Sequence, residues 1–291
     1  MSRMDSNDYI YILSIITPVY CPNQYLIDLT EKLFLESLAM SPMKNDFEII
    51  IVDDASPKRD ELKAMIEKTA REKALNIMLI RNEINQGLAK SINRGVHQSK
   101  APYILMTNND IYAPKDAIPR LLNLLRRDSR YGAVGPMLSF AFRHRIQEMD
   151  TGIVLNDFTT DEYKKIDSVA ESLAQTHNGA ITPANSLVGC FLMTPRSVFE
   201  DAGGINEHYG LGYHIESDLL IRVRKKGFKL AVDQSTLVFH GDVGIRDFYG
   251  PSMSTVKVRA KYNLLRNYAY FIFKNGWKEL FSLLNDYNPK Q

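Results

Sequence analysis

Asp53 and Asp54 form the first of three polar clusters that directly follow an apolar run in this 291-residue sequence. Carboxylates in such a position can accept hydrogen bonds from a ribose or from the imide group of a pyrimidine base. The alternative is structural, because Asp54 and Ser56 could cap a helix that begins near Pro57. This segment alone supports the two interpretations about equally.

Asn108, Asn109 and Asp110 form the second cluster, after the apolar residues 103–107. A carboxylate flanked by amides offers the oxygen ligands that a hard divalent cation prefers, and a diphosphate would complete the coordination shell. The alternative is a simple turn between Asp110 and Pro114, which explains this segment sufficiently when it is taken alone.

Glu216 and Asp218 form the third cluster, at the start of a predicted helix. The helix dipole favours acids on a first turn, and Asp218 can pair with Arg222 one turn later. These effects explain Asp218 without any function. They explain Glu216 less well, because the preceding Gly210–His214 has the composition of a ligand-facing loop. A carboxylate beside such a loop could act as a general base.

Two smaller features could contribute to the same chemistry. Asn85 and Gly87 precede a predicted helix that carries Lys90 near its start. Gly87 gives the backbone conformational freedom there, and a cation close to a helix start could face phosphate. His240 ends a predicted strand, and near a bound metal it would be a candidate ligand.

Strands and helices that alternate through the first half of the chain must position these residues. The predicted strands are Ile12–Thr17, Phe47–Val52, Ile77–Ile80, Tyr103–Thr107 and Ala133–Met137. The predicted helices are Gln24–Ala39, Asp60–Lys73, Leu88–Gln98 and Pro114–Arg127. Alternation of this kind predicts an α/β fold with a mostly parallel sheet and helices on both faces. Ligands bind such sheets beyond the carboxyl ends of the strands, where the first two clusters stand.

The second half gives weaker signals. From Ser139 to Ala184 no clear periodicity is present, and the stretch 157–165 is polar. Beyond it the pattern predicts a strand at Ser186–Thr194, helices at Pro195–Ala202 and Ile215–Lys226, and strands at Lys229–Val232 and Thr236–Phe239. Residues 246–291 read as helices that break near Asn275 and Gly276. We therefore expect one compact body and a helical C-terminal tail.

Composition excludes several classes of protein. Apolar residues make up 45% and charged residues 24% of the chain, as in ordinary globular proteins. The formal charge of +2 is too small to indicate nucleic acid as a partner. The only cysteines, Cys21 and Cys190, lie far apart, which favours a reduced, cytoplasmic protein. No run approaches the roughly eighteen apolar residues that cross a bilayer.

Taken in order, the motifs resemble those of the inverting family 2 glycosyltransferases of GT-A fold, including their rhamnosyltransferase-like members. The matching segments are Ser14–Tyr20, Ile51–Ser56, Asn85–Asn93, Thr107–Asp110, Gly189–Arg196, Gly203–Glu207 and Glu216–Arg222. Each motif is weak alone, and their shared order carries the resemblance. It implies transfer of a sugar from a UDP- or dTDP-sugar to an acceptor hydroxyl, in polysaccharide or glycan assembly. The acceptor could be a saccharide, or linked to a lipid or a protein.

The resemblance also implies roles for individual residues on the donor side. Residues implied to bind the nucleotide sugar are Thr17, Pro18, Val19, Tyr20, Asp53, Asp54, Asn85, Gly87, Lys90, Asn108 and Asn109. The family's DxD motif matches 108–110, which implies Mn²⁺ or Mg²⁺ bound at Asp110. Because Asn108 replaces the first acid, metal binding would lean on His240.

On the acceptor side, Glu216 matches the family's catalytic base, where Asp is more usual, and Asp218 matches the second acid of that pair. Residues 1–138 would then form the nucleotide-sugar-binding half of one GT-A domain, 139–245 the acceptor-binding and catalytic half, and 246–291 the tail. Two other functions stay open: a sugar-nucleotide pyrophosphorylase, and a nucleotide-sugar-binding protein without turnover.

The tail interleaves basic and aromatic residues between Val256 and Leu284. A helix of this composition can lie in a membrane interface, with its cations near anionic headgroups. The alternative, which we favour, is that its aromatic residues pack on the catalytic body or on a second subunit through 250–285.

Overall fold

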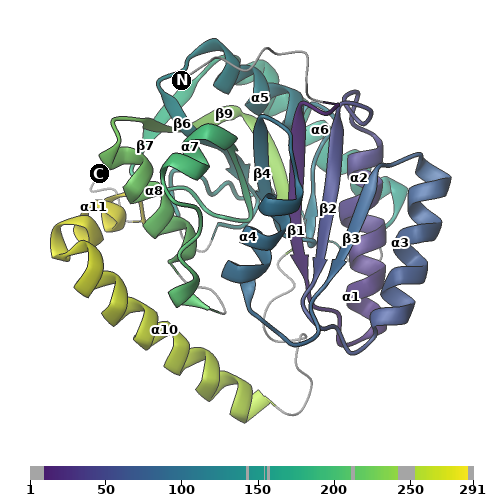
Figure 1. Cartoon of the computed structure of the whole chain (residues 1–291). Coiled ribbons are helices and arrows are strands. Elements are labelled where there is room, and N and C mark those ends of the chain that lie inside the picture. Colours follow the sequence, from purple (N-terminus) through teal and green to yellow (C-terminus); the bar gives the residue numbers. More distant parts are fainter. Residues whose placement is uncertain are drawn as a thin grey trace.

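The computed structural model describes residues 10–141, 144–153, 155, 158–210, 214–241 and 253–287, with side chains from 262 to 286 in the last segment. One mixed sheet forms the centre (Figure 1). Its first half consists of β1 (Leu13–Val19), β2 (Phe47–Asp53), β3 (Ile77–Arg81) and β4 (Tyr103–Thr107). These strands are parallel and lie in the order β3-β2-β1-β4.

The sheet continues past β4 with strands from the second half of the chain. These are β8 (Phe191–Pro195), β6 (Tyr131–Leu138), β9 (Lys229–His240), β5 (Ile111–Tyr112) and β7 (Ile181–Ala184). β8 runs antiparallel to both β4 and β6, so β6 and its parallel neighbour β9 point the same way as β1 to β4. β5 and β7 pair antiparallel with β9. The predicted mostly parallel sheet is confirmed.

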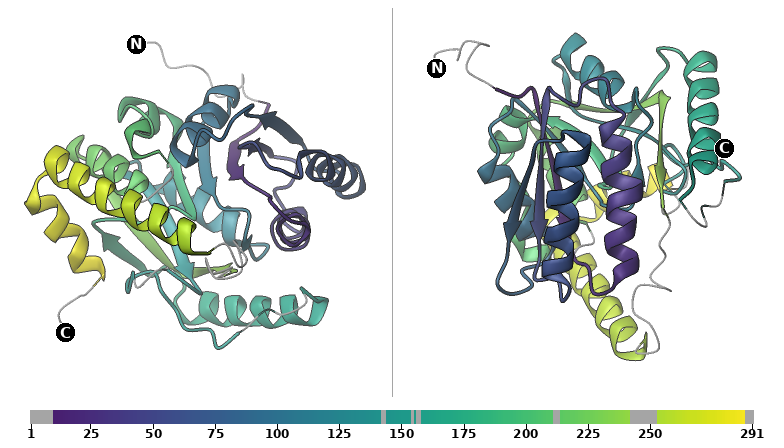
Figure 2. Two further views of the ribbon diagram at one scale, coloured as in Figure 1. Left: turned by 90° about the horizontal axis from the view of Figure 1, so that it is seen from below. Right: turned by 90° about the vertical axis from the view of Figure 1, so that its right-hand side faces the viewer.

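Helices cover both faces of this sheet, and the strands show why. In β2 all seven residues are buried, so its side chains alternate between two apolar layers. Ile49 and Ile51 join the layer formed with α1 (Gln24–Leu29), η1 (Thr30–Leu35), α2 (Glu36–Ala39), α3 (Arg59–Lys73) and α5 (Ala117–Arg127). Ile50 and Val52 join the layer formed with α4 (Leu88–Gln98), α7 (Arg196–Asp201) and α8 (Ile215–Lys225). Figure 2 shows the helices on the two sides.

The predicted elements of the first half are confirmed to within a few residues. In the second half two predictions were wrong. The strand predicted at 186–194 begins only at Phe191, and the two strands predicted within 229–239 are one, β9. The segment 139–184, for which the sequence shows no clear periodicity, contains α6 (Thr160–Thr176) and β7. The capping box of Thr159 and Glu162 was the overlooked signal for α6.

The tail forms α10 (Met253–Asn275) and α11 (Trp277–Tyr287), which run along one outer edge of the molecule (Figure 1). The predicted break is confirmed, because Gly276 between them has a φ of 84°, which disfavours other residues. A buried face of the tail, including Phe271 and Leu283, packs on the layer that contains α8. Among the described helices none is long and apolar enough to cross a membrane.

Candidate active site

The carboxyl ends of β2, β1 and β4 lie side by side, because these strands are adjacent and parallel. This edge brings Asp54, Tyr20 and the segment 108–110 together across two strand spacings, about 10 Å. β8 begins at the same edge, since Phe191 pairs with Thr107. The sheet therefore places Gly189 and Cys190, which precede β8, beside the second polar cluster.

The predicted base-contacting segment at the end of β1 alternates in exposure. Thr17 and Val19 are buried, whereas Pro18 and Tyr20 are partly exposed. The hydroxyl of Thr17 is buried and has no hydrogen-bond partner among the described residues. Only Pro18 and Tyr20 of this segment thus present side-chain surface to a ligand.

Asp54 is 5% exposed, and both of its carboxylate oxygens accept hydrogen bonds within the chain. Oδ1 accepts from Asn82 Nδ2 at 2.7 Å and from the amide of Gln86 at 2.7 Å. Oδ2 accepts from the amide of Gly87 at 2.8 Å. Asp54 therefore fixes the turn that leads into α4, and Asn82 is a contributor that the sequence analysis missed.

Asp53 also makes its contacts within the chain, since its Oδ1 accepts from the amide of Ser56 at 2.9 Å and its Oδ2 lies 3.8 Å from Arg81 Nε.

The alternative that Asp54 and Ser56 cap the helix near Pro57 was wrong. α3 begins at Arg59, and its N-cap residue Lys58 makes no side-chain capping hydrogen bond.

The turn held by Asp54 contains the other residues predicted for the donor side. Asn85 donates from Nδ2 to the Asp54 carbonyl at 3.2 Å. Gly87 has a φ of 85° and starts α4, so a side chain there would be strained. Lys90 is exposed, and its Nζ lies 3.3 Å from Gln86 Oε1. The structure presents this cation to solvent next to the turn.

Asp110 and His240 meet at the edge, with 3.4 Å between Asp110 Oδ1 and His240 Nε2. Asn108 Nδ2 lies 3.3 Å from the same Nε2. Burial alone would raise the pKa of Asp110, but the charge and hydrogen bond of His240 outweigh it, so this pKa is lowered. Asn109 turns away and donates from Nδ2 to Thr30 Oγ1 at 2.7 Å, which anchors the loop on η1.

The tautomer of His240 follows from its second ring nitrogen. Nδ1 lies 3.1 Å from the carbonyl oxygen of Phe140, which can only accept, so Nδ1 carries the hydrogen. The hydrogen that makes the ring positively charged therefore sits on Nε2, which faces Asp110; without this hydrogen, Nε2 presents a lone pair there. Such a second hydrogen bond is typical of a histidine that binds a metal ion.

These two side chains fit one divalent cation. Asp110 Oδ1 is buried and lies 3.4 Å from His240 Nε2. A carboxylate oxygen and an imidazole lone pair at this spacing could both reach a single ion. No group of three or more His, Cys, Asp or Glu side chains with metal-binding geometry occurs in the described part of the chain. The remaining ligands would have to come from a diphosphate or water.

Glu216 stands on the first turn of α8, against the loop before β8. A Cβ built on Gly189 would lie 3.3 Å from Glu216 Cβ. The amide of Asn108 donates to the carbonyl oxygen of Cys190 at 3.1 Å, so the loop on which Glu216 packs also contacts the second polar cluster. The pKa of Cys190 is raised by burial first and then by the charges of Asp110 and Glu216. Burial also raises the pKa of Glu216 itself, which makes its carboxylate a stronger base.

Asp218 is fully buried in a network that joins α8 to the tail. It pairs with Arg222 at 2.9 Å, as the alternative interpretation predicted, and with Lys274 at 2.9 Å. It also accepts from Asn275 Nδ2 at 3.1 Å and from the Tyr209 hydroxyl at 3.4 Å. These contacts give Asp218 a structural role, and a part in catalysis stays a prediction.

The loop predicted to face the acceptor lies only partly within the described residues, since 211–213 are outside them. His214 adopts a φ of 63° at the N-cap of α8 and contacts Tyr268 and Phe271 of α10. Support of this loop by the tail was not predicted from the sequence. The spacing of the aromatic residues in the tail was the signal that could have indicated it.

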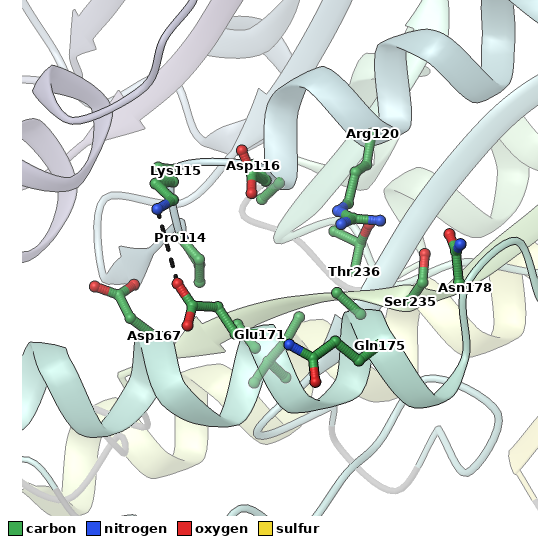
Figure 3. A pocket seen from close by; sticks show the side chains of 14 residues that line it. Pro114, Lys115, Asp116, Arg120, Asp167, Glu171, Gln175, Asn178, Ser235 and Thr236 are labelled. Carbon is green, nitrogen blue, oxygen red and sulfur yellow. Dashed lines mark ion pairs between the residues drawn. The ribbon is translucent and has the colours of Figure 1, made fainter.

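A cavity of about 460 Å³ lies elsewhere, between α5, α6 and β9 (Figure 3). Its lining carries two cations, Lys115 and Arg120, and three acids, Asp116, Asp167 and Glu171, and Lys115 lies 3.7 Å from Glu171. None of the predicted site residues lines it. With charges of both signs in its lining, the cavity indicates no particular ligand.

Residues 14–151, slightly less than half of the chain, match the family model of glycosyl transferase family 2. This segment is of the glycosyl transferase family 2 type. The match covers the strands that carry Asp54 and Asp110, and it confirms the resemblance found in the sequence.

Two solved structures share the fold of this chain. The mannosyltransferase PcManGT of Pyrobaculum calidifontis, solved with GDP-Man and Mn²⁺, superposes with a TM-score of 0.62 over 96% of this chain and 69% of that chain, at 16% identity. GalNAc-T7, solved with UDP, GalNAc and Mn²⁺, gives 0.59 over 81% of this chain and 44% of that chain, at 14% identity. The predicted GT-A-type fold is confirmed.

Two curated relatives match about half of this chain or less. The undecaprenyl-phosphate 4-deoxy-4-formamido-L-arabinose transferase of Pseudomonas fluorescens is 26% identical over 160 residues, 51% of this chain and 45% of that protein. An uncharacterized glycosyltransferase of Haemophilus influenzae is 32% identical over 117 residues, 40% of this chain and 35% of that protein. The chain thus spans less than half the length of these curated relatives.

Proposed function

We propose that the chain is an inverting glycosyltransferase that moves a sugar from a UDP- or dTDP-sugar to an acceptor hydroxyl with the help of Mn²⁺ or Mg²⁺. The observation that carries the proposal is that Asp110 pairs with His240 at the sheet edge, while the loop before β8 contacts Asn108 through Cys190 and Glu216 through Gly189. Two proteins of the same fold were solved with a nucleotide or nucleotide sugar and Mn²⁺, which supports a donor of this class.

Residues 1–138 supply the donor side in this proposal, and residues 139–245 the acceptor side. Pro18 and Tyr20 offer the exposed surface on which a nucleoside base can rest. Asp54 acts by holding the turn before α4 rather than through an unoccupied carboxylate. Lys90, exposed beyond that turn, supplies positive charge toward the phosphates.

Asp110 and His240 would hold the divalent cation, with Asp110 kept ionised by its lowered pKa. When bound, the ion neutralises the charge that develops on the departing nucleoside diphosphate. Asn108 lies against His240 Nε2 but brings no charge, so Asp110 is the only acid of residues 108–110.

Glu216 would take the proton from the acceptor hydroxyl as that oxygen attacks the anomeric carbon from the face opposite the leaving group. The new bond forms as the old one breaks, so the anomeric centre inverts. Burial raises the pKa of Glu216 and so strengthens it as a base. Its place on α8, beside Gly189, keeps it on the acceptor side of the sheet edge.

The need for a base distinguishes two acceptor classes. A hydroxyl must lose a proton in the reaction, whereas a phosphate acceptor is already ionised at neutral pH. One relative is named as an undecaprenyl-phosphate transferase. The desolvated carboxylate of Glu216 favours a hydroxyl acceptor for this chain.

Donor binding is tested by thermal shift with UDP- and dTDP-sugars, with and without Mn²⁺. A donor present at about 100 times its Kd should stabilise the native state by about 2.7 kcal/mol. Asp110→Asn should abolish the part of this stabilisation that needs Mn²⁺. Asp116→Asn, an exposed acid outside the site, is the matched control and should change nothing. Equal Mn²⁺-dependent shifts in both variants would contradict the metal assignment.

Transfer is tested with Glu216→Gln, using whichever donor gives a shift. The variant should bind the donor normally and lose about 10²- to 10⁴-fold of its transfer rate to a hydroxyl acceptor. Undiminished transfer would show that Glu216 is not the base. The proposed acceptor class would be rejected if the parent protein transferred no sugar to a hydroxyl and if the variant and the parent were equally active on a phosphate acceptor.

A further inference from the structure

The tail exposes a row of large apolar side chains on the side away from the catalytic body. Its members, here called the outer face, are Tyr262, Leu265, Phe273, Trp277, Phe281 and Leu284, which are 43% to 89% exposed. On α10 they fall at helical spacings opposite the buried Asn267 and Phe271. An ordinary surface scatters such residues singly, whereas a row of them marks an interaction site.

We propose that the outer face docks the protein on the surface of an anionic phospholipid bilayer. Residues 246–291 hold eight Lys or Arg against three Asp or Glu, whereas the rest of the chain holds 28 against 31. Two tails packed on each other would bring two positive surpluses together. An anionic headgroup layer complements both the charge and the aromatic side chains of this segment.

The side chains of the outer face are of the kinds that occupy a membrane interface. Trp277, the only tryptophan in the sequence, is 61% exposed beside the exposed Lys278. Its ring centroid lies 6.3 Å from that of Phe281. Aromatic rings partition to the headgroup level, and lysine side chains reach from there to the phosphates.

The tail is bound firmly enough to transmit such docking to the body. Lys274 lies 2.9 Å from Asp218, and Asn267 donates to the carbonyl of Tyr209 at 2.9 Å. In α11, Asp286 accepts from the amide of Asn185 at 2.7 Å. α10 also contacts His214, two residues before Glu216. If the proposed function is correct, docking holds the acceptor side of the site at the membrane.

Trp277 permits a direct test, because all tryptophan fluorescence of the full chain comes from this residue. The protein is titrated with vesicles of phosphatidylcholine, with or without phosphatidylglycerol, and sedimentation with the vesicles is measured in parallel. We expect a blue shift and co-sedimentation with the anionic vesicles, both weakened by salt. No nucleotide sugar is involved, so failure here leaves the proposed transfer reaction untouched.

Variants keep Trp277 as the reporter. Phe273→Ser with Phe281→Ser should weaken binding to anionic vesicles about 100-fold, about tenfold for each ring. Met78→Ser with Ile84→Ser, two exposed apolar residues on and beyond β3, is the matched control and should bind like the parent. Both variants alter exposed positions, so their melting temperatures should match that of the parent.

Three results would overturn the proposal. The first is an unchanged Trp277 emission with anionic vesicles. The second is equal binding to neutral vesicles, which would remove the charge argument. The third is a blue shift that follows protein concentration without vesicles, together with a dimer in light scattering, which would show that a second copy covers the outer face.

Discussion

Asp218→Asn tests whether this buried acid holds the tail or takes part in the chemistry. The side chain is fully buried, while its partners Arg222 and Lys274 keep 22% and 31% of their side-chain surface exposed. Removing one member of a buried ion pair costs about 3–5 kcal/mol. Because water partly solvates both cations, we expect the lower end, about 3 kcal/mol. For a chain of this size that is roughly 6–12 °C in Tm.

The pH dependence of this loss has a definite sign. Burial raises the pKa of Asp218, but hydrogen bonds from Lys274 and Asn275 and the charge of Arg222 lower it more, so the folded value lies below the reference of 3.8. A depressed carboxyl pKa stabilises the fold above the unfolded value, and this stabilisation is lost as pH falls through the folded value. The Tm difference should therefore be constant from pH 7 to 5 and shrink below about pH 3.8.

The Tm of the parent and of Asp218→Asn is measured by calorimetry from pH 7 to pH 3. The transfer rates of both proteins are then measured at a temperature well below their Tm. A structural Asp218 predicts a variant that keeps its rate within about threefold while it is folded. A catalytic Asp218 predicts a loss of about 10²-fold or more with little change in Tm. A Tm within about 1 °C of the parent at pH 7, or a gap as large at pH 3 as at pH 7, would refute the reasoning.

Lys274→Met, alone and combined with Asp218→Asn, measures the energetic coupling between these two residues. If the two residues stabilise the fold through their contact, the double variant should lose about 0.5–3 kcal/mol less than the sum of the single losses. Strict additivity would mean that the contact between α8 and α10 does not contribute.

Three further predictions concern the site and its frame. Gly241→Ala should lower the free energy of unfolding by about 1–3 kcal/mol, because the new Cβ would lie 2.8 Å from the Asp110 carbonyl oxygen. It should also weaken Mn²⁺-dependent donor binding. A thermal shift on adding donor and Mn²⁺ equal to that of the parent would contradict this prediction. Thr159→Ala should remove the capping box of α6 and cost about 1 kcal/mol in denaturant unfolding, whereas Thr176→Ala near the other end of α6 should cost less. The transfer rate should rise with pH as Glu216 loses its proton. Burial raises the pKa of Glu216 in the folded protein above its reference value of 4.5. The protonated side chain therefore stabilises the fold below pH 4.5, and this stabilisation is lost as pH rises through the folded pKa. We expect Glu216→Gln to melt at a higher temperature than the parent at pH 7.

The parallel half of the fold could be predicted because its signals are local. β2 is an apolar run buried along its whole length, and the amphipathic helices between the strands leave few ways to cover such a sheet. The second half was harder because β7 is short and largely exposed, and β9 passes two pairing irregularities against β6. α6 was missed although its capping box stands in the sequence.

Sequence by itself determined that the first two polar clusters lie at one edge of the sheet, because polar residues that follow parallel strands must gather there. It also indicated the resemblance to glycosyl transferase family 2. Only the tertiary structure decided which contacts each polar residue makes. Asp54 points its oxygens at a turn, Glu216 packs on Gly189, and Asp218 meets Lys274, 56 positions away in the chain.

The same distinction holds for the contact between Asp110 and His240 and for the tail. Asp110 and His240 come together because β5 pairs with the end of β9, and the carbonyl of Phe140 sets the tautomer. Composition showed a basic, aromatic tail but not which rings face the body. Hydrogen bonds and charges act over a few ångströms, so residues distant in sequence acquire their roles only when the fold brings them into contact.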